Sequence, residues 1–205
     1  GNRRRLANIV KGGCQHASTA MEPIREALVQ SPVAHVDETG CTLHGHRHWL
    51  HVFATEDLTA YHLDAKRGVE AMARMGLIPR YRGLLIHDCL GAYFTFQNCL
   101  HGICNAHTQR ELTYLHEQLE QAWAAEMIEL LLEAKDLAER EMNREEGSRR
   151  VIGEGRLKKI LNRYNEILSA GYTLNPEPPP KPKGQRGRVA RGKALNLLDR
   201  FDKYR

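Results

Sequence analysis

Two short segments each join an apolar strand pattern to a single aspartate, and they restrict the possible folds most strongly. The first reads His-Val-Asp-Glu-Thr-Gly over residues 35–40, and the second reads Leu-Ile-His-Asp-Cys-Leu-Gly-Ala-Tyr over residues 85–93. If the two strands are neighbours in one sheet, Asp37 and Asp88 lie side by side and repel each other. A divalent cation with a preference for oxygen ligands, Mg²⁺ or Mn²⁺, relieves that repulsion. We therefore predict that both aspartates are catalytic residues and metal ligands in phosphodiester chemistry.

The order of the expected elements favours a mixed sheet flanked by helices, the α/β class. The patterns predict a helix over 18–29, strands over 33–39, 47–54 and 58–63, a helix over 66–75 that Gly76 ends, a strand over 83–87, a short helix over 92–98 and a strand over 99–104. A helix between the hairpin and the later strand allows the two aspartate strands to run parallel. Because strand side chains alternate, Glu38 should point to the face opposite Asp37, in a supporting or structural role.

After Asn105 the pattern changes from strands to helices. Apolar residues at helical spacing predict one long amphipathic helix from Leu112 to Ala138, broken at 144–150. A second helix is expected from Leu157 to Leu168, with Gly171 as its end. A final helix begins near residue 194.

A Pro-rich stretch over 175–183 leads into a basic run over 181–193. The net charge of +5 agrees with a polyanionic partner. We interpret the run as a DNA-binding loop that contacts phosphates and carries affinity but no sequence reading; a solvated loop is the alternative. Its six basic residues are Lys181, Lys183, Arg186, Arg188, Arg191 and Lys193.

Two clusters of His and Cys offer a different metal site. We interpret the first as solvent-facing strand residues, because it lacks a Cys or carboxylate that would complete a tetrahedral set; it comprises His44, His46, His48 and His51. The second is better spaced for zinc, although strand alternation would separate its cysteines; it comprises Cys99, His101, Cys104 and His107. Zinc ligands and simple core thiols both remain open for the second cluster.

Several segments together resemble the transposases of insertion-sequence-66-type elements. The matching residues are Ser31-Pro32-Val33 with residues 35–40, Arg47-His48-Trp49-Leu50, Asp88 with Gly91-Ala92-Tyr93, Cys104-Asn105-Ala106-His107 with Arg110-Glu111-Leu112, and Gly187-Arg188 with Leu197-Leu198-Asp199-Arg200. The order and spacing of these motifs make the resemblance specific, from roughly residue 20 onward.

The resemblance implies an RNase H-like catalytic fold with a helical insertion after the fifth strand. It implies a DDE site in which two aspartates, matching Asp37 and Asp88, and a later glutamate hold two Mg²⁺ or Mn²⁺ ions. The glutamate belongs to an Asn-Asn-x-x-Glu-Arg-like segment, which these 205 residues lack. We therefore expect a fragment of a transposase that cleaves and joins DNA at insertion-sequence ends, with little activity alone.

The expected domains are a linker and helix over 1–30, a partial RNase H-like core over 31–108, and a helical insertion over 109–205 with its loop at 175–193. We expect DNA as partner, at element ends and target, and a homo-oligomer in the bacterial cytoplasm associated with the nucleoid. No membrane and no small-molecule cofactor are expected. The alternatives are another RNase H-like nuclease, such as a resolvase or RNA-strand hydrolase, a non-catalytic DNA-binding or regulatory fragment, and a small zinc module at 99–107.

Overall fold

The structure, a computed structural model, describes residues 2–142, 152–182, 186–187 and 189–204. The chain divides into two compact units, Gly1–Cys104 and Asn105–Arg205. Each unit has a hydrophobic core of its own. Among the described helices, none combines the length and apolar character that a membrane span requires.

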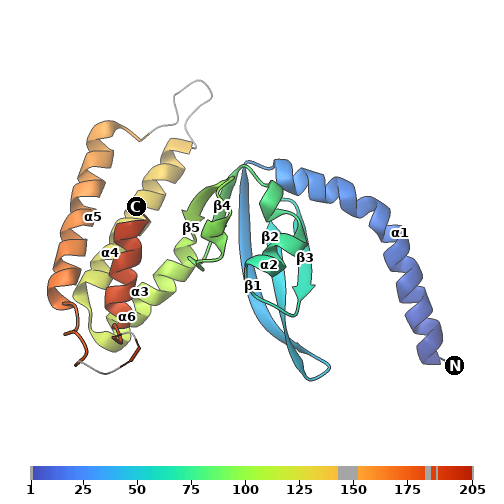
Figure 1. The fold of residues 1–205 in the computed structure, drawn as a ribbon. Helices are drawn as coiled ribbons and strands as arrows, with labels where there is room; N and C mark the ends of the chain where they lie inside the picture. Colours follow the sequence, from blue (N-terminus) through green and yellow to red (C-terminus); the bar gives the residue numbers. More distant parts are fainter. Residues whose placement is uncertain (1, 143–151, 183–185, 188, 205) are drawn as a thin grey trace. The chain divides into compact units, whose positions relative to one another are not determined.

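A five-stranded mixed sheet forms the centre of the first unit (Figure 1). Its strands are β1 Val33–Leu43, β2 His46–Ala54, β3 Thr59–Asp64, β4 Leu84–His87 and β5 Leu100–Ile103. The order across the sheet is β3-β2-β1-β4-β5. The first three strands form an antiparallel meander, whereas β4 runs parallel to β1 and β5 runs parallel to β4. The predicted mixed sheet flanked by helices is therefore confirmed.

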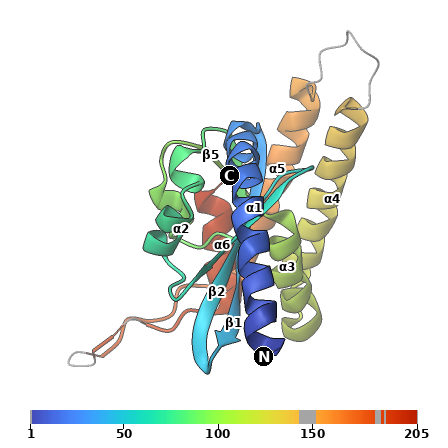
Figure 2. The same cartoon turned by 90° about the vertical axis from the view of Figure 1, so that its right-hand side faces the viewer.

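The helical elements of this unit are α1 Asn2–Gln30, α2 Val69–Met75 and the 3₁₀ turns η1 Ile78–Arg80 and η2 Tyr93–Thr95. Figure 2 shows α1 as one long helix, which begins well before the predicted residue 18. α2 ends at Gly76, whose φ of 75° is the left-handed conformation that glycine adopts readily. The helix predicted over 92–98 is only the single turn η2.

Strand alternation decides which face of the sheet is buried. Ala34 and Val36 of β1 point into the core, where they meet Phe53 of β2 and Leu85 of β4. α2, the C-terminal end of α1 and the two 3₁₀ turns contribute the rest of this core. On the opposite face the odd-numbered residues of β1 from Val33 to Thr39 are exposed.

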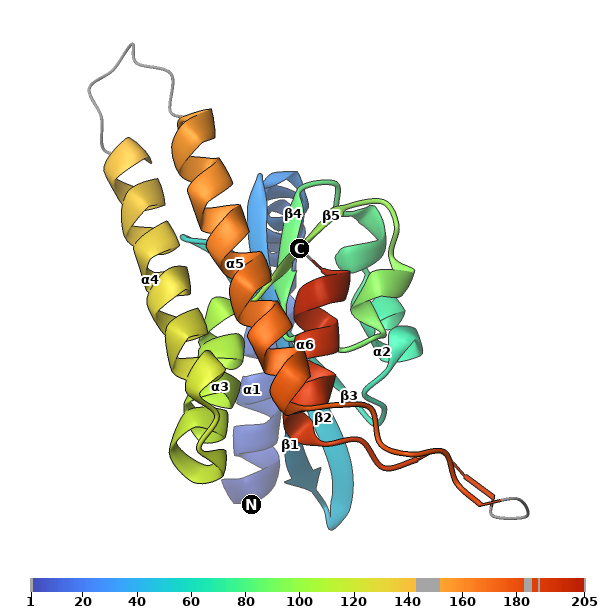
Figure 3. The same ribbon diagram turned by 90° about the vertical axis from the view of Figure 1, so that its left-hand side faces the viewer.

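Four described helices build the second unit: α3 Asn105–Leu119, α4 Ala122–Met142, α5 Glu154–Leu174 and α6 Lys193–Lys203. Each packs on the next in chain order, and α6 also contacts α3 (Figure 3). One apolar stripe from every helix faces the shared core, to which Leu112, Trp123, Leu168 and Leu198 belong. The predicted helix near residue 194 is confirmed.

The prediction of one long helix from Leu112 to Ala138 is wrong, because the chain turns between α3 and α4. Glu120 has a φ of 52°, which a continuous right-handed helix does not allow. The Gln121 side chain holds this turn, since its Oε1 accepts hydrogen bonds from Trp123 Nε1 at 2.8 Å and from Asn175 Nδ2 at 2.7 Å. The predicted break at 144–150 lies outside the described residues.

Gly171 does not end α5, contrary to the prediction; the helix continues to Leu174. A Cβ at this position would lie 2.5 Å from Leu198 Cδ2 and 3.2 Å from Trp123 Cδ2. Glycine is therefore required for the close approach of α6 to α5. The tendency of glycine to end a helix is outweighed by the packing of these two helices.

Candidate catalytic site

The parallel pairing of β1 with β4 brings Asp37, in the middle of β1, level with Asp88, which directly follows the end of β4. The register pairs Val33 with Leu84 and His35 with Ile86. Two residues further along each strand come Asp37 and Asp88, the latter directly after β4. Asp37 points away from the buried core, because its neighbour Val36 points into it, whereas Asp88 belongs to the turn that follows β4. The two residues are thus neighbours across the β1–β4 pairing.

Each aspartate is oriented by a nearby backbone amide. The Glu38 N–H donates to Asp37 Oδ1, and the Leu90 N–H donates to Asp88 Oδ1, both at 2.9 Å. Asp37 is exposed, whereas the Asp88 side chain retains 21% of its accessible surface. The turn after Asp88 contains Cys89 with a φ of 70°, an unusual conformation outside glycine. Both acids are therefore accessible and held in place.

Glu38 lies on the opposite face of β1, as predicted, with its side chain fully buried. Arg67 Nε donates to Glu38 Oε1 at 2.7 Å, and the Tyr93 hydroxyl donates to Glu38 Oε2. The Arg67 guanidinium also lies 4.9 Å from the centroid of the Trp49 ring, in a cation–π arrangement. A buried carboxylate is costly unless it is paired, and these contacts satisfy it.

Arg67 connects this buried carboxylate to Asp88. Its Nη2 lies 3.9 Å from Asp88 Oδ2. The hydrogen bond to Glu38, together with the charges of Glu38 and Asp88, raises the pKa of Arg67. Burial raises the pKa of Tyr93, and the charges of Glu38, Asp88 and Asp37 add to this. All three carboxylates therefore act on one tyrosine hydroxyl.

Two histidines fix the backbone beside Asp88. His87 Nδ1 accepts from the Cys89 N–H at 3.3 Å, so its Nε2 carries the proton and donates to His101 Nδ1 at 3.0 Å. His101 Nε2 in turn donates to the Phe96 carbonyl at 3.0 Å. Burial, followed by the charge of His101, lowers the pKa of His87 to about 4.

Comparison with known proteins decides the family. The profile of the Transposase IS66 family matches residues 2–189. The chain belongs to this family. No curated protein matches the sequence significantly. Among solved structures, the HTLV-2 integrase catalytic core domain in complex with magnesium (trimeric form) is similar at 13% identity, covering 75% of this chain and 90% of that chain with a TM-score of 0.30.

In this IS66 family member the carboxylate oxygens of Asp37 and Asp88 are ligands of the kind that a hard divalent cation prefers. Mg²⁺ binds through one or two carboxylates and takes its other ligands from water and substrate phosphate. Asp37 and Asp88 are two such carboxylates, with access to solvent. Within the described residues, no group of three or more His, Cys, Asp or Glu side chains is arranged to hold a metal ion.

That finding also bears on the His and Cys clusters, and it gives the zinc alternative no support in the described chain. His101 uses both ring nitrogens in hydrogen bonds. In the first cluster the expectation of solvent-facing histidines is wrong for His51, which is 1% exposed. Its Nε2 lies 3.1 Å from the Lys66 carbonyl, and it stands opposite Glu38 in the β1–β2 register.

The predicted DNA-binding residues differ in their surroundings. Lys181 and Arg186 are exposed, and Lys181 Nζ donates to the Arg186 carbonyl at 3.1 Å. Arg191 is committed to ion pairs of 2.5 Å with Glu177 and with Asp199. The remaining members are Lys193, which contacts Tyr114, and Lys183 and Arg188, which lie outside the described residues.

Sequence reasoning did not identify Arg67, Trp49 or Tyr93 as parts of the site. The one signal was Glu38, since an acidic residue on the inward face of a strand requires a partner. The identity of that partner depends on how the loop after β3 folds back, which no local pattern encodes.

Proposed function

We propose that this chain carries the metal-binding edge of a DNA transposase, with Asp37 and Asp88 as catalytic carboxylates. The observation that supports the proposal is the β1–β4 register in an IS66 family chain, because the residues two positions before each acid, His35 and Ile86, are paired. The reaction class is phosphodiester cleavage at insertion-sequence ends followed by strand transfer to target DNA.

In this proposal Asp37 and Asp88 would hold a Mg²⁺ or Mn²⁺ ion, which would supply activation of a water molecule and charge stabilisation for the attacking and leaving oxygens. The protein contributes positioning and electrostatics and uses no covalent nucleophile. Arg67 and the His87–His101 chain keep Asp88 in a fixed orientation, so that little reorganisation accompanies cation binding.

We also propose that these 205 residues alone cleave DNA poorly or not at all. They contain no Asn-Asn-x-x-Glu-Arg-like segment for the third carboxylate that the family site uses. Incubation with supercoiled plasmid and Mn²⁺ tests this point. Nicking that disappears in Asp88→Ala would contradict it.

Mn²⁺ titration of the isolated chain, followed by calorimetry or electron paramagnetic resonance, tests the metal site. We expect Asp37→Asn and Asp88→Asn each to weaken Mn²⁺ binding by about tenfold or more, because each removes one of two charged ligands. Asp57→Asn is the matched control, since Asp57 is an exposed residue between β2 and β3. Equal Mn²⁺ affinity in Asp88→Asn and Asp57→Asn would refute the proposed site.

A further inference from the structure

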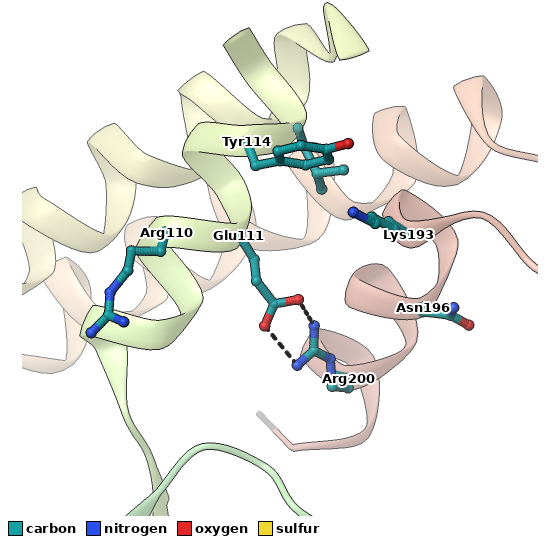
Figure 4. Close-up of a pocket in the computed structure, with 7 residues that line it drawn as sticks. Arg110, Glu111, Tyr114, Lys193, Asn196 and Arg200 are labelled. Atoms are coloured by element: carbon teal, nitrogen blue, oxygen red, sulfur yellow. Dashed lines mark hydrogen bonds and ion pairs between the residues drawn. The ribbon is translucent and has the colours of Figure 1, made fainter. Parts of the chain in front are cut away.

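The second unit contains a hollow of about 600 Å³ that lies away from the proposed catalytic residues in the sequence. Helices α3 and α6 border it, as Figure 4 shows. Its lining residues are Arg110, Glu111, Tyr114, Leu115, Lys193, Asn196 and Arg200. Hollows of this size suit small molecules or single units of a polymer.

Positive charge exceeds negative charge in this lining, since three cations face one carboxylate. Arg200 forms a two-pronged pair with Glu111, in which Nη1 lies 2.9 Å from Oε1, so its guanidinium has a fixed orientation. Arg110 is exposed at the rim of the hollow, where its side chain points away from Tyr114 and Lys193 (Figure 4). The hollow therefore retains cationic capacity for an anionic ligand.

An accessible aromatic ring stands beside these cations. Tyr114 is 41% exposed, and Lys193 Nζ lies 4.1 Å from its ring centroid. Leu115, next to it in the chain, is 1% exposed and anchors α3 in the core. Exposure of a tyrosine ring in a basic hollow offers a flat apolar surface next to charges that neutralise phosphate.

We infer that the α3–α6 hollow binds an unpaired nucleotide of DNA, with its base against Tyr114 and its phosphates near Lys193 and Arg110. In a duplex the base faces are covered by neighbouring pairs, so a ring in a hollow reaches only an unstacked base. An acidic peptide would use the cations and leave the aromatic surface without a stacking partner. The inference rests on the proposed function only in naming DNA as the polymer.

The test measures DNA binding by the full chain in EDTA, so that catalysis and metal binding play no part. The probe is a short single-stranded oligonucleotide that contains 2-aminopurine, whose fluorescence falls when the base stacks. We expect quenching with the unmodified chain. Tyr114→Ala should abolish the quenching and weaken binding about tenfold, whereas Tyr114→Phe should preserve both.

Charge is tested separately with Arg110→Gln, which should weaken single-strand binding and reduce its salt dependence. Lys159→Gln is the control, because Lys159 is an exposed cation on α5 outside this hollow. Circular dichroism checks that Tyr114→Ala remains folded. If it does not, the comparison of single-strand affinity between Arg110→Gln and Lys159→Gln tests the inference.

Three outcomes would overturn the inference. These are unchanged quenching in Tyr114→Ala, an equal loss of affinity for blunt duplex and single strand, or displacement of the oligonucleotide by an acidic peptide that binds more tightly. Failure of the Mn²⁺ site alone would leave the expected results unaffected, so the two proposals can fail independently.

Discussion

Arg67 contacts one buried carboxylate, that of Glu38, and one partly exposed carboxylate, that of Asp88. Arg67→Gln removes the cation and leaves the Glu38 charge buried with the Tyr93 hydroxyl as its remaining partner in this network. We expect the free energy of unfolding to fall by about 2 kcal/mol, a value reduced by the partial exposure of Arg67. Denaturant unfolding, followed by circular dichroism, measures it.

The control for this prediction is a double-mutant cycle with Glu38→Gln, which removes the charge that Arg67 neutralises. The double variant should be less destabilised than the sum of the two single variants, because no unpaired charge is left. Strict additivity of the two losses would show that the ion pair contributes nothing specific to stability.

At the level of single residues, the side of a strand on which a side chain lies could be predicted from the sequence, whereas the residues that it contacts could not. Alternation in β1 correctly separated Glu38 from Asp37, because period-2 geometry is local. The same reasoning was wrong for His51, since the burial of a strand residue depends on what packs over the sheet. Arg67 lies in the connection between β3 and α2, and its reach to Glu38 is a tertiary contact.

At the level of elements, the close packing around Gly171 leads to a prediction about the stability of α5. Gly171→Ala gains helix propensity of about 1 kcal/mol, yet its Cβ would overlap the Leu198 side chain and crowd Trp123. We expect a net loss of about 1 to 3 kcal/mol in unfolding free energy. Gly155→Ala, in the same helix with nothing within 4 Å of the added Cβ, should be neutral or stabilising. If Gly171→Ala had the same unfolding free energy as the unmodified chain, or a higher one, then α5 and α6 would be able to move apart without a loss of stability.

Strands and most helix positions could be predicted, because their apolar periods are local signals. The turn at Glu120 and the continuation of α5 through Gly171 could not. The apolar stripe of α3 continues into α4 without a change of period, so the pattern does not reveal that the chain reverses. The reversal depends on Gln121, whose amide oxygen contacts both Trp123 and Asn175.

For the molecule as a whole, the sequence identified the change of character at Asn105, where the structure divides the chain into its two units. The expected hairpin of β2 with β3 and the expected parallel pairing of β1 with β4 are both present, whereas the place of β5 in the sheet had not been predicted. The metal-binding role of the aspartates remains a prediction. The sequence did not reveal the α3–α6 hollow, because Arg110 and Lys193 are 83 positions apart and meet only when the helices pack.

The net charge of +5 is a property of the whole chain, and the structure shows which cations of the proposed DNA-binding loop are exposed and which are engaged in ion pairs. Removal of Lys181 and Arg186 together, by substitution with Gln, should weaken duplex binding and lower the slope of log K against log salt by about 2. Arg191→Gln should change the slope less, because its charge is neutralised by Glu177 and Asp199. Fluorescence anisotropy over a salt series measures the slopes. If Arg191→Gln produced the larger change, its ion pairs would have to open on DNA, and the exposed cations would not be the contacts.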